Sequence, residues 1–253
     1  MLSALKGDDR RARIEALVEL ESGTASIDAE VCRALVDLLA DPSKAVHRRA
    51  AGALSRAAAD PANREIIEQA LDAEDEHTRW CAAFALARAG DDGDKVVRAA
   101  IDALGRNDGD VRWAAAEIVC AAVRRRPELE PLVRDTAAND RGDRRKMALY
   151  CLRDLGCNET EVYLDALDDA DQGVRLAALS GLAKAPVLDA AGVERVIAVM
   201  ERDPAPGVCR AAGAALARFA SDERVAQALG AARASSDPNV VRATRPRRVR
   251  EDS

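Results

Sequence analysis

The side chains that most often carry catalysis or hold metals are few in this chain of 253 residues, which has only two histidines, His47 and His77. No spacing of cysteines and histidines suits a zinc site. The sequence has no glycine-rich phosphate loop and no Gly-x-Ser-x-Gly nucleophile motif. Carboxylates are plentiful, but no pair stands out as a general acid and base. We therefore expect no catalytic residue, no metal and no other cofactor.

The cysteines form no CxxC motif and no regular framework, which predicts reduced and mostly buried thiols. They are Cys32, Cys81, Cys120, Cys151, Cys157 and Cys209. The N-terminal residues do not resemble a signal peptide, and no run of 18 apolar residues occurs. These observations predict a cytoplasmic protein without a membrane segment.

The most distinctive side chains are aromatic, because tryptophan, tyrosine and phenylalanine make up only 2% of the chain. Trp80 in "HTRWCAAFAL" and Trp113 in "DVRWAAAEIV" lie 33 residues apart, and both follow an arginine at the head of an alanine-rich segment. Tryptophan buries a large apolar area and is frequent where proteins bind partners. The two segments therefore indicate a repeated element that carries a binding surface.

A repeat of 30 to 34 residues runs through the sequence, and its first position, position 0, follows a turn that contains aspartate. Position 0 is filled by Ala12, Val46, Thr78, Val111, Arg144, Val174, Val208 and Val241. Position +4 is alanine in the first seven copies, and position +8 is leucine or valine. Positions 0, +4 and +8 share one face of a helix, which we expect to form the core.

A second amphipathic segment precedes each of these helices from the second copy on. Residues 29–41, 93–106 and 192–203 carry apolar residues at helical spacing, and aspartate–proline pairs mark several turns. No segment has the pattern of a strand. Each unit is therefore predicted to be a helix, a turn and a helix. Because one pair cannot bury its apolar face alone, the pairs must stack into a solenoid.

The segments "DGDVRWAAAEIV" (108–119) and "DQGVRLAALSGL" (171–182) resemble HEAT repeats of the short bacterial type, as found in phycobilisome-lyase-like proteins. The resemblance implies an all-α fold, a right-handed α-α superhelix of about seven to eight helix pairs. We expect residues 1–243 to form a single solenoid and residues 244–253 to form a basic, disordered tail. The family serves unrelated roles, so the resemblance implies a fold more than a function.

Position +1 is arginine in most copies, and in HEAT proteins such arginines pair with turn aspartates in a ladder along the stack. The resemblance implies this structural role for Arg13, Arg79, Arg112, Arg145 and Arg175. Asp108 and Asp171, three residues before position 0, are the partners we expect. His47 occupies position +1 in the second copy, and we interpret it as a substitute in the ladder.

Positions +2, +6 and +9 lie opposite the core, and in HEAT-like solenoids the second helix of each pair lines the concave surface. We expect the partner-binding residues on this concave face: Trp80, Phe84, Trp113, Glu117, Lys146, Tyr150 and Arg153. With position +10 included, the face has eight basic and three acidic side chains, although the net charge of the chain is −6. This balance favours an acidic protein or peptide as partner. In the alternative interpretation, the aromatic residues only pack over neighbouring helices.

The leading hypothesis is a non-catalytic scaffold that grips a protein or peptide in its concave groove. One alternative is an enzyme that resembles HEAT-like DNA glycosylases, with Trp113, Glu117 and Lys146 in the site. The isoelectric point of about 5.2 argues against nucleic-acid binding. The other alternative is a phycobilin lyase-like protein that handles a chromophore near Cys120. The arginine-rich tail is either a solvated end or an electrostatic tether for an acidic partner.

Overall fold

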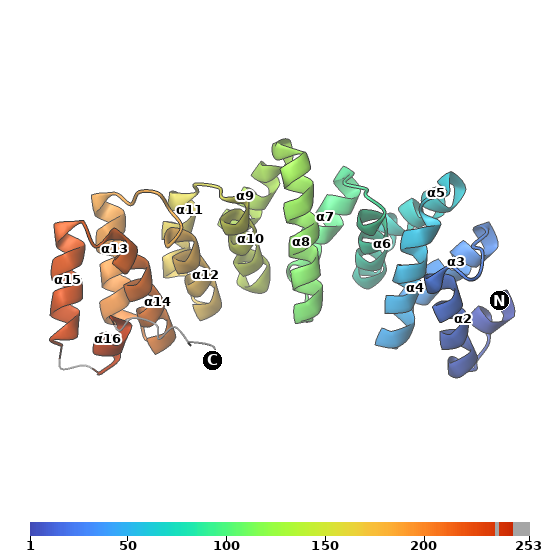
Figure 1. The fold of residues 1–253 in the computed structure, drawn as a ribbon, viewed down its shortest axis with the longest axis horizontal. Helices are drawn as coiled ribbons and strands as arrows, with labels where there is room; N and C mark the ends of the chain where they lie inside the picture. Colours follow the sequence, from blue (N-terminus) through green and yellow to red (C-terminus); the bar gives the residue numbers. More distant parts are fainter. Residues whose placement is uncertain (236–237, 245–253) are drawn as a thin grey trace, which may run out of the picture. The chain divides into compact units, whose positions relative to one another are not determined.

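The computed structural model describes residues 1–235 and 238–244. Sixteen α-helices and five 3₁₀-helices follow one another in these residues, without a strand (Figure 1). The all-α prediction is therefore confirmed. None of the described helices is long and apolar enough to cross a membrane. Residues 245–253, which make up most of the expected basic tail, lie outside the described residues.

The chain divides into two compact units, the first comprising residues 1–104 and 108–122 and the second comprising residues 105–107 and 123–253. The helices of the first unit are α1 (Leu2–Lys6), α2 (Arg10–Ser22), α3 (Ala29–Asp37), α4 (Lys44–Ala57), α5 (Pro61–Gln69), α6 (Glu76–Arg88), α7 (Asp94–Ala103) and α8 (Gly109–Arg125). Residues 123–125 of α8 belong to the second unit.

The helices of the second unit are α9 (Glu130–Asn139), α10 (Gly142–Leu155), α11 (Thr160–Asp165), α12 (Gln172–Leu182), α13 (Ala190–Arg202), α14 (Pro206–Leu216), α15 (Glu223–Arg233) and α16 (Pro238–Ala243). The short 3₁₀-helices are Leu38–Ala40, Ala70–Asp72, Pro127–Leu129, Ala166–Asp168 and Ala217–Phe219. Three of them directly continue α3, α5 and α11, which are first helices of their pairs. The expected alternation of first and second helices is thus present in both units.

The core of each unit lies along the predicted face of the second helices. In the first unit α2 packs against α4 and α4 against α6, and in the second unit α10 packs against α12 and α12 against α14. Ala50 and Leu54 of α4 are fully buried, as are Ala148 and Leu152 of α10. Alanine at position +4 allows close approach of neighbouring helices, while leucine at position +8 fills the space between them.

Aspartates at position −3 are the N-caps of the second helices. Asp9, Asp75 and Asp171 each accept a hydrogen bond from a backbone N–H in the first turn of the helix that follows. These caps satisfy amides that have no partner within the helix, which explains why these turns end in an aspartate.

The residue at position +1 ties the turn before its own helix to the next pair. Arg13 donates to the carboxylate of Asp41 at 2.9 Å and to the carbonyl of Gly7 at 2.5 Å. Arg175 binds both oxygens of Asp203, at 2.7 and 3.0 Å, and the carbonyl of Asp169 at 2.7 Å. These bonds connect consecutive repeats and satisfy polar groups of the turns.

The other position +1 residues make parts of the same arrangement. Arg145 donates to Asp169 at 2.7 Å, and Arg79 donates to the turn carbonyls of Ala73 and Glu74 at 2.6 and 2.7 Å. The ring of His47 lies with Nδ1 3.1 Å from the carbonyl of Asp41, the same kind of turn carbonyl. Arg112 lies half-buried on α8.

The acidic partners of this ladder differ from the ones expected. The accepting carboxylates belong to Asp41, Asp169 and Asp203, at position −5 of the following copy. Asp171 instead caps α12 through the N–H of Gly173, and Asp108 accepts from Lys44 at 2.6 Å. The reason is local: position −3 is the N-cap, where the helix's own amides compete for the side chain.

Candidate functional site

The two tryptophans of the shared repeat position have opposite environments. Trp80, on α6, is only 5% exposed, whereas Trp113, on α8, is 52% exposed. The exposure expected for Trp80 is therefore wrong. Its indole packs on the ring of Phe84, one turn further along α6, with 5.7 Å between the ring centroids. Trp80 serves the packing of the first unit, and Trp113 presents the larger apolar surface to solvent.

Helices flank α6, which carries Trp80, on both sides. In the first unit α6 lies between α4 and α8 (Figure 1). Arg48 of α4 forms an ion pair with Asp110 of α8 at 3.2 Å, so charged side chains from the two flanking helices meet across α6. A helical wheel drawn for α6 alone contains neither of the flanking helices, so it cannot predict that Trp80 is buried.

Two acidic residues flank Trp113 along α8. Asp110 lies three residues before the tryptophan and Glu117 four residues after it, so all three share one face of the helix. The side chain of Asp110 is 81% exposed, and Glu117 is also exposed. The first unit thus presents an indole between two carboxylates.

The predicted residues of the second unit cluster on α10, where their charges are neutralised by neighbours. The guanidinium of Arg153 stacks on the ring of Tyr150 at 4.7 Å from the centroid. Arg153 also donates to Asp154 at 2.8 Å and to the hydroxyl of Ser180 at 3.1 Å. The hydrogen bond from Arg153 holds the pKa of Asp154 below its ordinary value. This cluster fixes α10 against α12 and leaves little free positive charge.

Other basic residues of the expected concave face also have acidic partners. Lys146 pairs with Asp143 within α10, and Lys184 lies 3.7 Å from Asp154. Arg48 lies 3.9 Å from Asp108 as well as close to Asp110. Together with Arg153, four of the eight basic residues of this face thus have acidic partners, whereas Arg56 donates to the carbonyl of Leu20 and Arg88 lies over the ring of Phe84.

A buried phenol near the α10 cluster was not anticipated from the sequence. Tyr163, on α11, is 2% exposed, and its hydroxyl has no hydrogen-bond partner among the described residues. Burial is the main reason that the pKa of this phenol is raised above its ordinary value. Gly181 of α12 leaves the space that the ring occupies, and a glycine inside a helical pattern was the one available signal.

The two histidines also meet, although they are 30 residues apart. The rings of His47 and His77 stack edge to face with 4.3 Å between centroids, and the thiol of Cys81 lies 3.7 Å from Nε2 of His77. Within the described ranges, no three histidine, cysteine or acidic side chains are grouped so that they could hold a metal ion. Cys120, considered for a chromophore, is 6% exposed.

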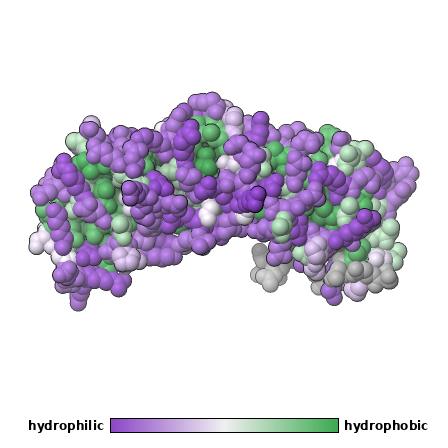
Figure 2. All heavy atoms as spheres, turned by 180° about the vertical axis from the view of Figure 1, so that it is seen from behind, coloured by the Kyte–Doolittle hydropathy of each residue, from purple (hydrophilic) through white to green (hydrophobic). Residues whose placement is uncertain are grey.

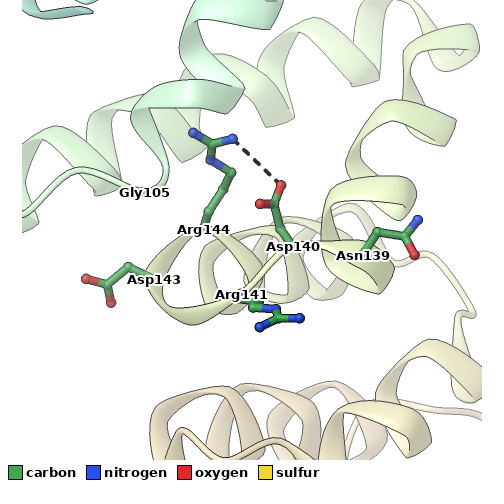
Figure 3. Close-up of a pocket in the computed structure, with 6 residues that line it drawn as sticks. All are labelled: Gly105, Asn139, Asp140, Arg141, Asp143 and Arg144. Carbon is green, nitrogen blue, oxygen red and sulfur yellow. Dashed lines mark ion pairs between the residues drawn. The ribbon is translucent and has the colours of Figure 1, made fainter.

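An open pocket of about 450 Å³ in the second unit is lined by Gly105, Asn139, Asp140, Arg141, Asp143 and Arg144 (Figure 3). Arg144 and Asp140 point toward one another and form an ion pair at 3.8 Å. Asn139, Arg141 and Asp143 point in other directions rather than toward a common centre. The pocket therefore lacks the convergent polar groups of a small-molecule site.

Seen from behind, the surface is mainly hydrophilic, and hydrophobic atoms show in separate patches between charged side chains (Figure 2). The large apolar residues that remain exposed in the described part of the chain are Met1, Val18, Trp113 and Val187. Of the residues expected to bind a partner, Trp113 is therefore the one with a large exposed apolar surface. The predicted binding residues are divided between the two units. The first unit contains Trp80, Phe84, Trp113 and Glu117, and the second contains Lys146, Tyr150 and Arg153.

Comparison with known proteins identifies the repeat. A family model of HEAT repeats matches residues 32–117 and 160–245. No curated protein sequence matches the chain. Among solved structures, Kap95p, determined with RanGDP, is 13% identical with a TM-score of 0.65 over 96% of this chain and 39% of its own. The Escherichia coli protein YibA is 16% identical with a TM-score of 0.59, covering 94% of this chain and 85% of its own.

An engineered protein is also similar, with 21% identity and a TM-score of 0.50 over 96% of this chain and 75% of its own. At these identities the three likenesses concern the fold alone. They agree with the stacked helix pairs observed in both units.

Proposed function

Because the chain belongs to the HEAT-repeat family, we propose that it is a non-catalytic scaffold that binds a protein or peptide partner. The observation that carries the proposal is the 52% exposure of Trp113 in an otherwise well-packed array of helices. Tryptophan is enriched among the residues that contribute most to binding at protein interfaces. The similarity to Kap95p, solved with RanGDP, supports a protein as the partner.

The proposed binding surface is the exposed side of the second helices. In the first unit it includes Trp113 and Glu117, with Phe84 half-buried beside the covered Trp80. In the second unit it includes Tyr150 and Arg153, held in their stacked arrangement on α10. Such pre-ordered side chains lose little entropy when a partner binds, which favours a rigid scaffold.

A non-catalytic role is supported by how the charged groups are used. Arg144 and Asp140 at the pocket neutralise one another, and the arginines at position +1 satisfy turn carbonyls and carboxylates. An acidic partner, favoured by the count of basic residues, would have to displace carboxylates already bound to Lys146 and Arg153. The scaffold proposal therefore does not depend on an acidic partner.

We further propose that residues 1–243 act as a single solenoid of short bacterial-type repeats, as phycobilisome-lyase-like proteins have. The spacing of 30 to 34 residues supports this subtype. A cytoplasmic location is part of the same proposal, supported by the burial of all cysteines except Cys157 and by their lack of a regular disulfide framework.

The proposal is tested by recovering partners from cells of the source organism with the full chain as bait and identifying them by mass spectrometry. We expect Trp113→Ala to reduce recovery of the bound partner by about tenfold or more, as at interface hot spots. Val187→Ala, at a site 72% exposed in the second unit, is the matched control and should change nothing. Equal recovery by both variants, or no partner above an empty resin, would contradict the proposal.

A further inference from the structure

We propose that the N-terminal half of α8 binds arginine side chains of an extended basic segment of another protein. Trp113 is the surface on which a guanidinium stacks, and Asp110 and Glu117 are its hydrogen-bond acceptors. This inference rests on the proposed scaffold function and adds the chemistry of the partner, which is opposite to the acidic partner favoured by the amino-acid count.

The geometry of one helix carries the first step. Asp110, Trp113 and Glu117 are spaced by three and four residues on an α-helix of 17 residues, so they form a continuous stripe on its surface. Trp113 is 52% exposed and the Asp110 side chain 81% exposed, so about half of the indole and most of this carboxylate face solvent. A cation over the indole would have a carboxylate within one turn on each side.

The ion pairs near this stripe indicate whether the partner carries positive or negative charge. On α4, Lys44 donates to Asp108 at 2.6 Å and Arg48 to Asp110 at 3.2 Å, so both neighbouring cations already have acceptors. The hydrogen bond from Lys44 also keeps the pKa of Asp108 below its ordinary value, so this carboxylate stays ionised. The carboxylate of Glu117 forms no ion pair within the described part of the chain. Glu117 therefore leaves a negative charge on the stripe that an incoming cation can complement.

Arginine suits this stripe better than lysine. A guanidinium is planar and weakly hydrated, so it can lie flat on the indole while its N–H groups reach carboxylates at the rim. The compact ammonium of lysine is strongly hydrated and has no flat face to stack. The ion pair of Arg48 with Asp110 is exposed, and exposed pairs contribute little stability, so a partner guanidinium can exchange with Arg48.

The two-tryptophan composition provides a direct measurement. In a Trp80→Phe variant of the full chain, Trp113 is the only remaining tryptophan, and its emission reports on this site alone. The probe is a short glycine–serine peptide that carries several arginines, and matched peptides carry lysine or glutamate instead. We expect a saturable change in emission and protection from acrylamide quenching with the arginine peptide. Binding should be about tenfold weaker with the lysine peptide and absent with the glutamate peptide.

Charge-neutral variants separate this role from a structural one. Glu117→Gln and Asp110→Asn should each weaken binding of the arginine peptide by about threefold to tenfold. Glu201→Gln, at an exposed position of α13, is the matched control and should leave binding unchanged. Arg48→Ala should strengthen binding, because it releases Asp110 for the partner; a merely structural role of Arg48 would not produce this gain.

Other outcomes overturn the inference in distinguishable ways. Binding of the glutamate peptide in place of the arginine peptide would establish an acidic partner. If no peptide gives a saturable change in emission, the proposed arginine site is wrong, and the partner-recovery experiment still tests the scaffold separately. The chain's own arginine-rich segment, Arg242 to Arg250, is a second source of arginine. If the peptide binds only to a variant that ends at residue 244, this segment occupies the stripe and the commitment to another protein is wrong.

Discussion

At the scale of the residue, the second unit depends on one missing side chain. Tyr163 of α11 is 2% exposed, and its ring lies where a Cβ on Gly181 of α12 would overlap with it. The missing side chain of Gly181 leaves room for the phenol. A glycine inside a helix, however, is less stable than an alanine would be, because the unfolded chain has more conformational freedom. The packing of α11 against α12 depends on the absence of a side chain at Gly181.

We predict that Gly181→Ala lowers the free energy of unfolding by about 1–3 kcal/mol, because the added methyl group would force the buried Tyr163 ring to move. Gly230→Ala in α15 is the matched control, since a methyl group there would have no atom of the described residues within 4 Å apart from its own helix. The control should raise stability by about 0.5–1 kcal/mol through helix propensity. Urea unfolding followed by far-UV circular dichroism measures both, and a stabilising Gly181→Ala would show that the ring has room to shift.

At the scale of the element, buried arginines connect each second helix with the turn of the next pair. Arg175 of α12 and Asp203 before α14 are 10% and 5% exposed as side chains, and they share two hydrogen bonds. The hydrogen bond to Asp203 raises the pKa of Arg175 above its ordinary value. The pair also orders the turn, because Asp203 accepts from the backbone N–H of Ala205.

Removing this arginine should be costly. We predict that Arg175→Ala lowers the free energy of unfolding by about 3–5 kcal/mol, since it leaves the buried carboxylate of Asp203 without its cation. Arg11→Ala should change it by less than about 0.5 kcal/mol, because the side chains of Arg11 and Glu15 are 88% and 63% exposed. Equilibrium denaturation of both variants checks the comparison. A loss of equal size in the two would mean that burial does not govern the strength of these pairs.

At the scale of the whole molecule, stability is distributed along the array because each helix pair packs mainly on its neighbours. Both tryptophans lie in the first unit, whereas helices occur in both units. Tryptophan emission therefore follows unfolding of the first unit, and far-UV circular dichroism follows the whole chain.

We predict that the two signals separate in variants that weaken one unit. Arg175→Ala should shift the dichroism curve to lower urea while the emission midpoint moves less. Arg13→Ala, which removes the largely buried pair with Asp41 in the first unit, should shift the emission midpoint more. Coincident curves in both variants would show instead that the chain unfolds as one cooperative body.

The helices and their core faces could be predicted from the sequence because they follow from local periodicity. Alanine at position +4 and leucine at position +8 predict one buried face, and Ala50 and Leu54 are fully buried. The N-caps were not predicted, because aspartates at position −3 were assigned to the arginine ladder, although Asp9 and Asp75 stand directly before their helices. These features need only the few residues that one helical turn brings together.

The candidate site depended on contacts that periodicity does not contain. Trp80 and Trp113 occupy the same position of the repeat, yet only the tertiary structure decides that one is covered and the other open. The pairing of Arg48 with Asp110 joins residues 62 positions apart, and it depends on which helices lie side by side. The sequence by itself therefore determined the stacked helix pairs, because local apolar spacing dictates them. The exposed surface was decided by the tertiary structure, because exposure and charge pairing are properties of neighbours in space.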